Sequence, residues 1–210
     1  MSASILTMIQ TYRDLLEARE QVAVGRMMSA YIVARGDILE TLERLIAQIE
    51  AAIAAGEDVS MSWLFRQQRY HQLLRETEQA IKALAPSYAG MIATEQAYAI
   101  GLAIEAVEQL TLFQLPPSPM IRAQFTKLPM SAMEHLVGAT ADGSPLADLL
   151  AELGTDAAKR VRDELIKGVA TGKNPRETAR KIVDALDGNQ TRARAIARTE
   201  TLRAYTESSL

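Results

Sequence analysis

Residues 36–56 read Gly36-Asp-Ile-Leu-Glu-Thr-Leu-Glu-Arg-Leu-Ile-Ala-Gln-Ile-Glu-Ala-Ala-Ile-Ala-Ala-Gly56, and their spacing decides the fold. Aliphatic residues recur at intervals of three and four, which is the repeat of one helical face. They are Ile38, Leu42, Leu45, Ile49 and Ile53, and the same spacing begins the chain at Ile5, Ile9, Tyr12 and Leu16. The segment from about 4 to 55 is therefore predicted to be helical. Gly36 lies in its middle, where glycine either kinks one helix or separates two, the second capped by Asp37.

The following segments extend the helical prediction. Gly56-Glu-Asp-Val-Ser60 has the composition of a turn, and a helix is expected from about Met61 to Leu84. Its inward-facing residues are predicted to be Leu64, Leu74, Ile81 and Leu84. No segment shows the sustained alternation of apolar and polar residues that is typical of a half-buried β-strand. The chain is therefore predicted to be all-α.

A stripe of small residues marks the helix expected from about Tyr88 to Leu115. Its members recur at spacings of three and four and are Gly90, Ala93, Ala97 and Gly101. Side chains this small let another backbone come close, so we expect the stripe to pack on a helix of this chain or of another copy. Acidic residues in the same segment argue against a helix in a bilayer, namely Glu95, Glu105 and Glu108.

The run Leu115-Pro-Pro-Ser-Pro-Met120 is the strongest break in the sequence. Proline fixes its own backbone and removes an N–H donor, so this run should form an extended and stiff connection. We expect residues 1–115 to form an elongated N-terminal bundle of long helices that relies on another copy or a partner. Residues 116–119 are the predicted linker, and residues 120–210 are the predicted smaller helical domain.

Glycine and proline punctuate shorter helices after this linker. Helices are expected over 146–153, over 157–170, from 175 to about 188, and from 190 onward. Gly154 should interrupt the chain, and Gly172 should follow the end of a helix. Asn174 and Pro175 have the order of an N-cap and a first helical residue. Asn189 should cap the last helix.

The 210 residues carry a net charge of −3, and this small value hides a division along the chain. The charge is −8 up to Asp156 and +5 from Ala157 to Leu210. A basic C-terminal third can meet phosphate or an acidic protein surface. Cysteine is absent from the sequence, and no apolar stretch reaches the roughly 18 residues that suggest a membrane span. We therefore expect a protein without disulfides or membrane spans, made in a reducing cytoplasm.

Candidate catalytic and cofactor sites are weak. The run from Gly168 to Lys173 resembles a phosphate-binding loop, but that motif needs four residues between its glycines and a hydroxyl residue after the lysine. Here three residues separate the glycines and Asn174 follows the lysine, so we interpret both glycines as helix punctuation. His71 and His135 lack metal-ligand spacing. Two aromatic residues are interpreted as core or interface anchors, namely Trp63 and Tyr70. No catalytic residue, metal or cofactor is expected.

The last expected helix carries a charged stripe. At about 100° per residue one face holds Ile196, Glu200, Arg203 and Glu207. The spacing of Arg203 from both acids allows ion pairs. We expect Glu200, Arg203 and Glu207 to form an inner, partly buried network, and Arg198 on another face to contact a second protein. The alternative is a solvated face with ordinary helical ion pairs.

Three runs in the C-terminal third carry a family resemblance, namely Gly143–Leu150, Leu165–Arg180 and Arg192–Tyr205. The most specific blocks are G-x-N-P-x-x-x-A-R at 172–180 and A-R-T-E-x-x-R-A-Y at 197–205. Over about Leu128 to Tyr205 the chain resembles the head-morphogenesis family of tailed phages, the Mu F-like minor head proteins. The resemblance marks these residues for interaction: Gly172, Asn174, Pro175, Arg180, Arg198, Thr199, Glu200, Arg203 and Tyr205.

The resemblance implies a minor capsid protein, present at low copy, that associates with the portal vertex on the inside of the head. It implies a part in head morphogenesis and in packaging or delivery of the genome. The implied partners are the portal protein and other capsid components. The implied location is the virion, after synthesis in the cytoplasm of the bacterial host. Family members usually continue past the second block into a further segment, which we expect this sequence to lack, as a natural short form, a processed product or a piece of a larger chain.

Two other classes of protein stay open on the residues. A helical nucleic-acid-binding protein would contact phosphates through Arg192 and Arg194, with Arg198 and Arg203, and its affinity for DNA would fall steeply with salt. An oligomeric helical adaptor would instead bind another copy of itself through the stripe from Gly90 to Gly101.

Overall fold

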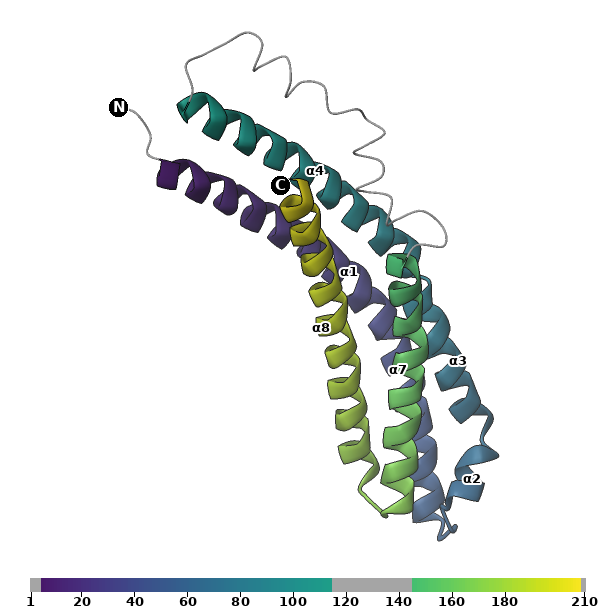
Figure 1. Cartoon of the computed structure of the whole chain (residues 1–210). Coiled ribbons are helices and arrows are strands. Elements are labelled where there is room, and N and C mark those ends of the chain that lie inside the picture. The colour runs from purple at the N-terminus through teal and green to yellow at the C-terminus, as the bar shows by residue number, and fades with distance from the viewer. Residues whose placement is uncertain (1–4, 115–144, 209–210) are drawn as a thin grey trace. The chain divides into compact units, whose positions relative to one another are not determined.

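The computed structural model describes residues 5–114 and 145–208, and no strand occurs in these two ranges. The helices are α1 (Ile5–Ala54), α2 (Met61–Phe65), α3 (Gln68–Lys82), α4 (Ala85–Gln114), α7 (Pro145–Ala170) and α8 (Pro175–Ser208) (Figure 1). The prediction of an all-α fold is therefore confirmed. The predicted linker at 116–119 lies outside the described residues, as does His135. No described helix combines the length and the apolar character that a membrane span requires.

Helix α1 is a single helix that continues through Gly36. It ends at a turn centred on Gly56, whose φ of 76° lies in the left-handed region that favours glycine. The Gly56 N–H donates to the carbonyl oxygen of Ile53 at 3.0 Å, and the Glu57 N–H donates to that of Ala52 at 3.0 Å. These two bonds satisfy carbonyl groups that the end of a helix would leave unpaired.

The single helix expected over 61–84 is wrong, because the chain forms α2 and α3 with a break between them. Ser60 Oγ accepts the Trp63 N–H at 3.3 Å at the start of α2, and Gln67 is extended just before α3. The break changes the helical phase. Leu73 is consequently fully buried, whereas Leu74, which was expected to face inward, is half-buried.

The described residues pack into two compact units, each built from separate stretches of the chain. The first unit contains residues 5–27, 88–114, 145–147 and 194–208, and the second contains 28–87 and 148–193. Each unit takes residues from before and after the predicted linker. The contacts thus group the chain differently from the predicted division into 1–115 and 120–210.

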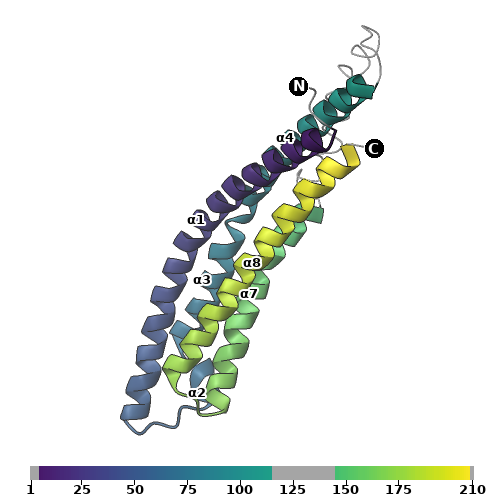
Figure 2. The ribbon, with the colours of Figure 1, turned by 90° about the vertical axis from the view of Figure 1, so that its left-hand side faces the viewer.

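The second unit is a four-helix bundle of α1, α3, α7 and α8. Four polar contacts join these helices in a ring: Thr41 to Glu76, Thr155 to Glu78, Asn189 to the Leu153 carbonyl, and Tyr31 to the Leu186 carbonyl. Figures 1 and 2 show α7 and α8 side by side and antiparallel. Large side chains fill the centre, including Ile38, Leu45, Leu73, Leu150 and Leu165.

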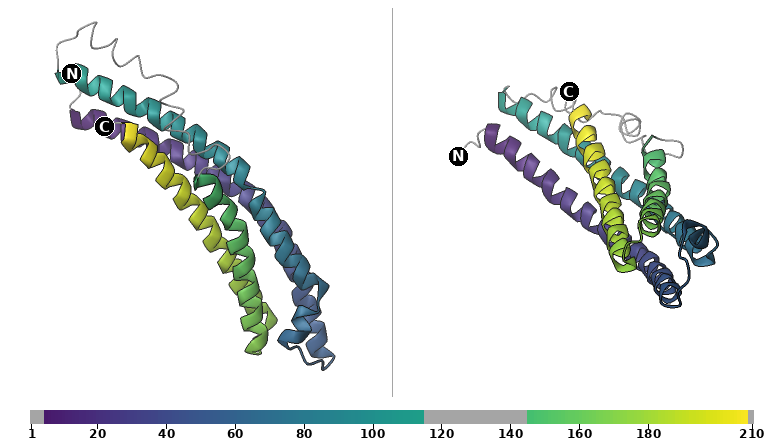
Figure 3. Two further views of the ribbon diagram at one scale, coloured as in Figure 1. Left: turned by 45° about the vertical axis from the view of Figure 1, so that its right-hand side comes forward. Right: turned by 90° about the horizontal axis from the view of Figure 1, so that it is seen from below.

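The first unit joins α1, α4 and the last part of α8. Helices α1 and α4 run antiparallel in it (Figure 3). The Tyr88 hydroxyl donates to the Met27 carbonyl at 2.9 Å, and Arg19 Nε lies 2.8 Å from Glu95 Oε2. The Arg19 guanidinium also stacks 4.6 Å from the centre of the Tyr98 ring. Polar bonds and a cation–π contact therefore align the two helices along this unit.

Helices α7 and α8 are each continuous, so the breaks expected at Gly154 and Asn189 are wrong. Gly154 lies where α7 touches α3, and a Cβ there would be 2.6 Å from the backbone oxygen of Glu78. Asn189 is buried inside the bundle, and its side-chain amide donates to the Leu153 carbonyl at 2.9 Å. Both residues serve contacts between helices, and neither ends a helix.

Candidate interaction site

The first motif block forms the turn between α7 and α8 in the second unit. Gly172 has a φ of 60°. Its N–H donates to the Val169 carbonyl at 3.2 Å, and the Lys173 N–H donates to the Gly168 carbonyl at 3.0 Å. This is the double hydrogen bond of a glycine-terminated helix. The prediction that Gly172 follows a helix end is confirmed.

Asn174 and Pro175 start α8 as predicted. The Asn174 side-chain oxygen accepts the Arg176 N–H at 2.8 Å, which satisfies one of the free donors at the start of a helix. Pro175 is the first helical residue, where proline's missing N–H has no cost. These motif residues therefore set the direction in which the chain leaves the turn. Arg180 is exposed on α8 one turn further on.

Gly168 is a packing residue, so its interpretation as helix punctuation is wrong. It lies inside α7, and a Cβ added to it would be 2.3 Å from Thr178 Oγ1 on α8. Thr178 is itself buried. The α7–α8 hairpin is consequently held together by a close approach that only glycine allows.

The second motif block lies on α8 in the first unit and is anchored by small and aromatic residues. Ala197 and Ala204 are buried. Tyr205 packs on a cluster formed by Tyr12, Leu16, Ala99, Leu102 and Ala106. Burial raises the pKa of Tyr205. The block thus fixes the last turns of α8 on α1 and α4.

The prediction of an inner, partly buried position is confirmed for Glu200 and wrong for Arg203, and the network with Glu207 stays a prediction. Arg203 is exposed and Glu200 is half-buried, while the side chain of Glu207 lies outside what the structure describes. The buried face of this part of α8 carries alanines at 193, 197 and 204. Alanine lets the helix lie close to its neighbours, so the charged stripe is turned toward the edge of the contact.

Arg198 and Thr199 are exposed, as expected of residues that can meet another protein. Arg198 Nε lies 3.6 Å from Glu20 Oε1, and its side chain keeps 62% of its surface exposed. An ion pair this open contributes about 0–1 kcal/mol. The exposed residues of the second block are Arg198, Thr199, Leu202 and Arg203.

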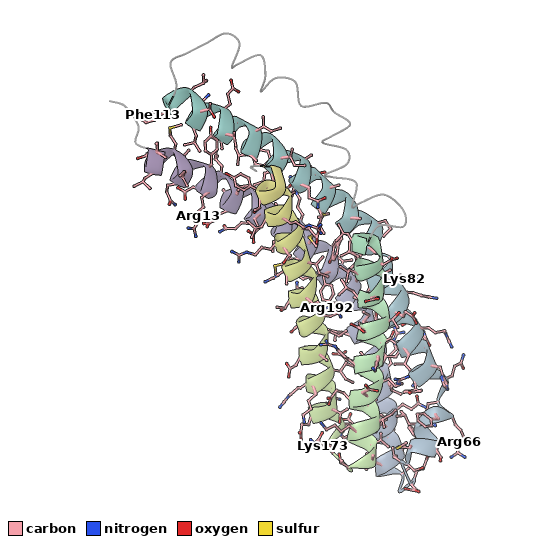
Figure 4. The ribbon with its side chains drawn as sticks, in the orientation of Figure 1. Arg13, Arg66, Lys82, Phe113, Lys173 and Arg192 are labelled. Atoms are coloured by element: carbon pink, nitrogen blue, oxygen red, sulfur yellow. The ribbon has the colours of Figure 1, made fainter. Side chains whose placement is uncertain are left out.

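The two arginines proposed for phosphate contact are drawn into the protein. Arg192 forms an ion pair with Asp156 of α7 (Figure 4). Arg194 is half-buried. Asp156 offsets part of the charge that Arg192 could offer to phosphate, and the Arg192 side chain keeps 38% of its surface exposed.

The small-residue stripe on α4 has no close helix neighbour among the described residues. Gly90 and Gly101 are exposed, and nothing described lies within 4 Å of a Cβ built on either. Ala93 and Ala97 are half-buried. Close packing on a described helix is therefore wrong at Gly90 and Gly101, and packing of the stripe on another copy stays a prediction. Close approach occurs instead at Gly154 and Gly168.

The aromatic anchors and the described histidine have structural surroundings. Trp63 and Tyr70 are buried in the second unit, which confirms them as core residues. His71 is exposed, and its Nε2 lies 2.7 Å from the Phe65 carbonyl oxygen. Within residues 5–114 and 145–208 no group of three or more histidine or acidic side chains is placed to hold a metal ion.

The geometry defines an all-α protein with a four-helix bundle and a C-terminal helix that carries an anchored face and an exposed face. Comparison with protein-family models, with curated proteins and with solved structures found no match to this chain.

Proposed function

We propose that this chain is a minor head protein of a tailed phage that acts in head morphogenesis at the portal vertex. The resemblance of the blocks at 172–180 and 197–205 to Mu F-like proteins supports it. The observation that carries the proposal is that the second block has both buried residues and exposed polar residues. Ala197, Ala204 and Tyr205 anchor α8, while Arg198, Thr199 and Arg203 between them are exposed.

The proposed role is contact between proteins and includes no catalytic step. In this proposal the turn block holds the α7–α8 hairpin rigid, because Gly172, Asn174 and Pro175 satisfy the backbone at the junction. A rigid hairpin loses little freedom when a partner binds. Arg198 and Arg203 lie about 140° apart around α8, so they are open on different sides of the helix. In this proposal these two residues and Thr199 contact the portal protein or another capsid component inside the head. Help in packaging or delivering the genome would follow from that position.

Binding to portal rings tests the proposal. The chain is produced together with a portal protein and a major capsid protein of a tailed phage, and its presence on purified portal rings and in heads is measured. Arg198→Ala should leave folding intact, since its pair with Glu20 is open, but should reduce incorporation into heads. Asp184→Ala, an exposed change on α8 outside both blocks, is the matched control.

Two results would contradict the proposal. One is a chain that associates with neither portal rings nor heads at any stage of assembly. The other is equal incorporation of Arg198→Ala and of a double variant, Thr199→Ala with Arg203→Ala. A steep fall of DNA affinity with rising salt, with no portal binding, would support the nucleic-acid-binding alternative instead.

A further inference from the structure

A pocket opens in the second unit between the C-terminal part of α1 and the turn that joins α7 to α8. Its volume is about 220 Å³. Its walls are mainly apolar and include Ile46, Ile49, Ile53, Leu165 and Val169. An apolar cavity of about 150 Å³ holds benzene, so this pocket has room for a hydrocarbon group of about eight carbons.

The pocket lining contains one cation and one carboxylate, Lys173 at the α7–α8 turn and Glu57 at the turn after α1. Lys173, which lines the pocket, has its Nζ 3.5 Å from Glu177 Oε1. The Nζ of Lys181 lies 3.6 Å from the same oxygen. Close contact with the Lys173 ammonium lowers the pKa of Lys181. Two cations therefore share one carboxylate, and a second carboxylate beside them would be stabilised.

The other charged residue of the lining is already engaged. Glu57 belongs to the turn after α1, and its Oε2 accepts the indole N–H of Trp63 at 2.9 Å. A ligand cation would compete with that hydrogen bond for the carboxylate. An anion instead meets the Lys173 ammonium at the α7–α8 turn, which Figure 4 labels, with the Lys181 ammonium of α8 close by.

We propose that this pocket binds a medium-chain fatty acid in its carboxylate form. The hydrocarbon chain lies between α1 and α7, and the carboxylate lies beside Lys173 and Lys181. Apolar walls without a ring of convergent polar groups suit a hydrocarbon better than a sugar or a nucleotide. The proposal goes beyond the proposed function and does not rest on it.

Titration of the full chain with three eight-carbon probes tests the chemistry. Octanoate, 1-octanol and octylammonium share one chain and differ in head-group charge. Binding is followed by the NMR shifts of residues that line the pocket. Octanoate should bind about three- to fivefold more tightly than octanol, the effect of one exposed ion pair, and octylammonium should bind most weakly. Equal affinities, tighter binding of octylammonium, or no saturable shift with octanoate would overturn the proposal.

Chain length tests the size of the pocket. Each methylene from butanoate to octanoate should strengthen binding by about fourfold, because each buries apolar surface. The gain should stop between octanoate and dodecanoate, where the pocket is full. A gain that continues unchanged to dodecanoate would mean that the chain lies on an open surface, which contradicts the assignment.

Variants separate the head-group contact from the hydrocarbon contact. Lys173→Gln should reduce octanoate binding to the level of octanol and leave octanol unchanged. Lys159→Gln, at an exposed lysine of α7 outside the pocket lining, is the matched control and should leave the binding of octanoate and of octanol unchanged.

Val169→Phe should fill the pocket and abolish the binding of both octanoate and octanol. Circular dichroism checks that this variant folds. If that variant does not fold, Ile53→Glu at a side chain that is 51% exposed serves instead, and should weaken octanoate most. Unchanged binding in Lys173→Gln, or equal loss in Lys159→Gln, would overturn the proposal.

Discussion

Replacing Gly154 by alanine tests the closest backbone contact in the second unit. The new Cβ would lie 2.6 Å from the Glu78 carbonyl oxygen and 3.1 Å from the Lys82 nitrogen, both backbone atoms of α3. Backbone cannot swing aside as the end of a side chain can, so α7 must move away from α3. Overpacking of this kind costs about 1–3 kcal/mol. Alanine regains up to about 1 kcal/mol over glycine inside a helix. The expected net loss in the free energy of unfolding is therefore up to about 2 kcal/mol.

The matched control is Gly36→Ala, in α1 of the same unit. No described heavy atom lies within 4 Å of a Cβ at Gly36, so only the helix preference acts there. That variant should gain about 0.5–1 kcal/mol, opposite in sign to Gly154→Ala. Urea unfolding followed by circular dichroism measures both. If Gly154→Ala gains as much stability as Gly36→Ala, α7 does not touch α3 at this point and the arrangement of the bundle is wrong.

Three further substitutions test other contacts. Tyr88→Phe removes the bond to the Met27 carbonyl and should cost about 1 kcal/mol near neutral pH. Burial raises the pKa of Tyr88 from 10.0 to about 12. The contribution of the Tyr88 hydroxyl to stability should therefore be complete below pH 10 and fall as the pH rises toward 12. Alkaline unfolding of the parent protein and of Tyr88→Phe checks this pH dependence. Tyr205→Ala should cost about 1–3 kcal/mol in thermal unfolding by removing a half-buried ring from its cluster, and no loss would contradict that packing. Arg176→Ala breaks contacts of 2.7 and 2.9 Å to Glu50, but both side chains are open to water, so a loss of more than about 1 kcal/mol would contradict their exposure.

The helices with regular apolar spacing were predictable from local sequence. Ile38, Leu42, Leu45 and Ile49 are buried on one face of α1 as their spacing indicates. The turn between α7 and α8 was also predictable, because Gly172, Asn174 and Pro175 each have a local backbone reason for their place. The apolar spacing of α1 and the backbone preferences of the α7–α8 turn involve residues only a few positions apart. Tertiary contacts do not override these local preferences at either place.

The errors occur where one residue type serves two purposes. A glycine that ends a helix and a glycine that admits a neighbouring helix look the same in sequence, so Gly154 was interpreted as a break. Asn189 was interpreted as a cap for a similar reason, since a buried asparagine and a capping asparagine differ only in what surrounds them. The charged stripe on α8 showed the period of the helix but not which face is inward. The alanines at 193, 197 and 204, spaced by four and seven, were the signal that could have shown it.

Trp63 makes the chain well suited to optical study, because it is the single tryptophan of the sequence. It is buried in the second unit, and its indole N–H is bonded to Glu57. Its emission therefore reports the opening of the second unit, whereas four of the six tyrosines, Tyr12, Tyr88, Tyr98 and Tyr205, belong to the first. Selective excitation of the indole and absorbance of the phenols would then follow the two units with separate probes in one unlabelled sample. Coincident curves would mean that the two units unfold together, and separated curves would give each unit its own stability.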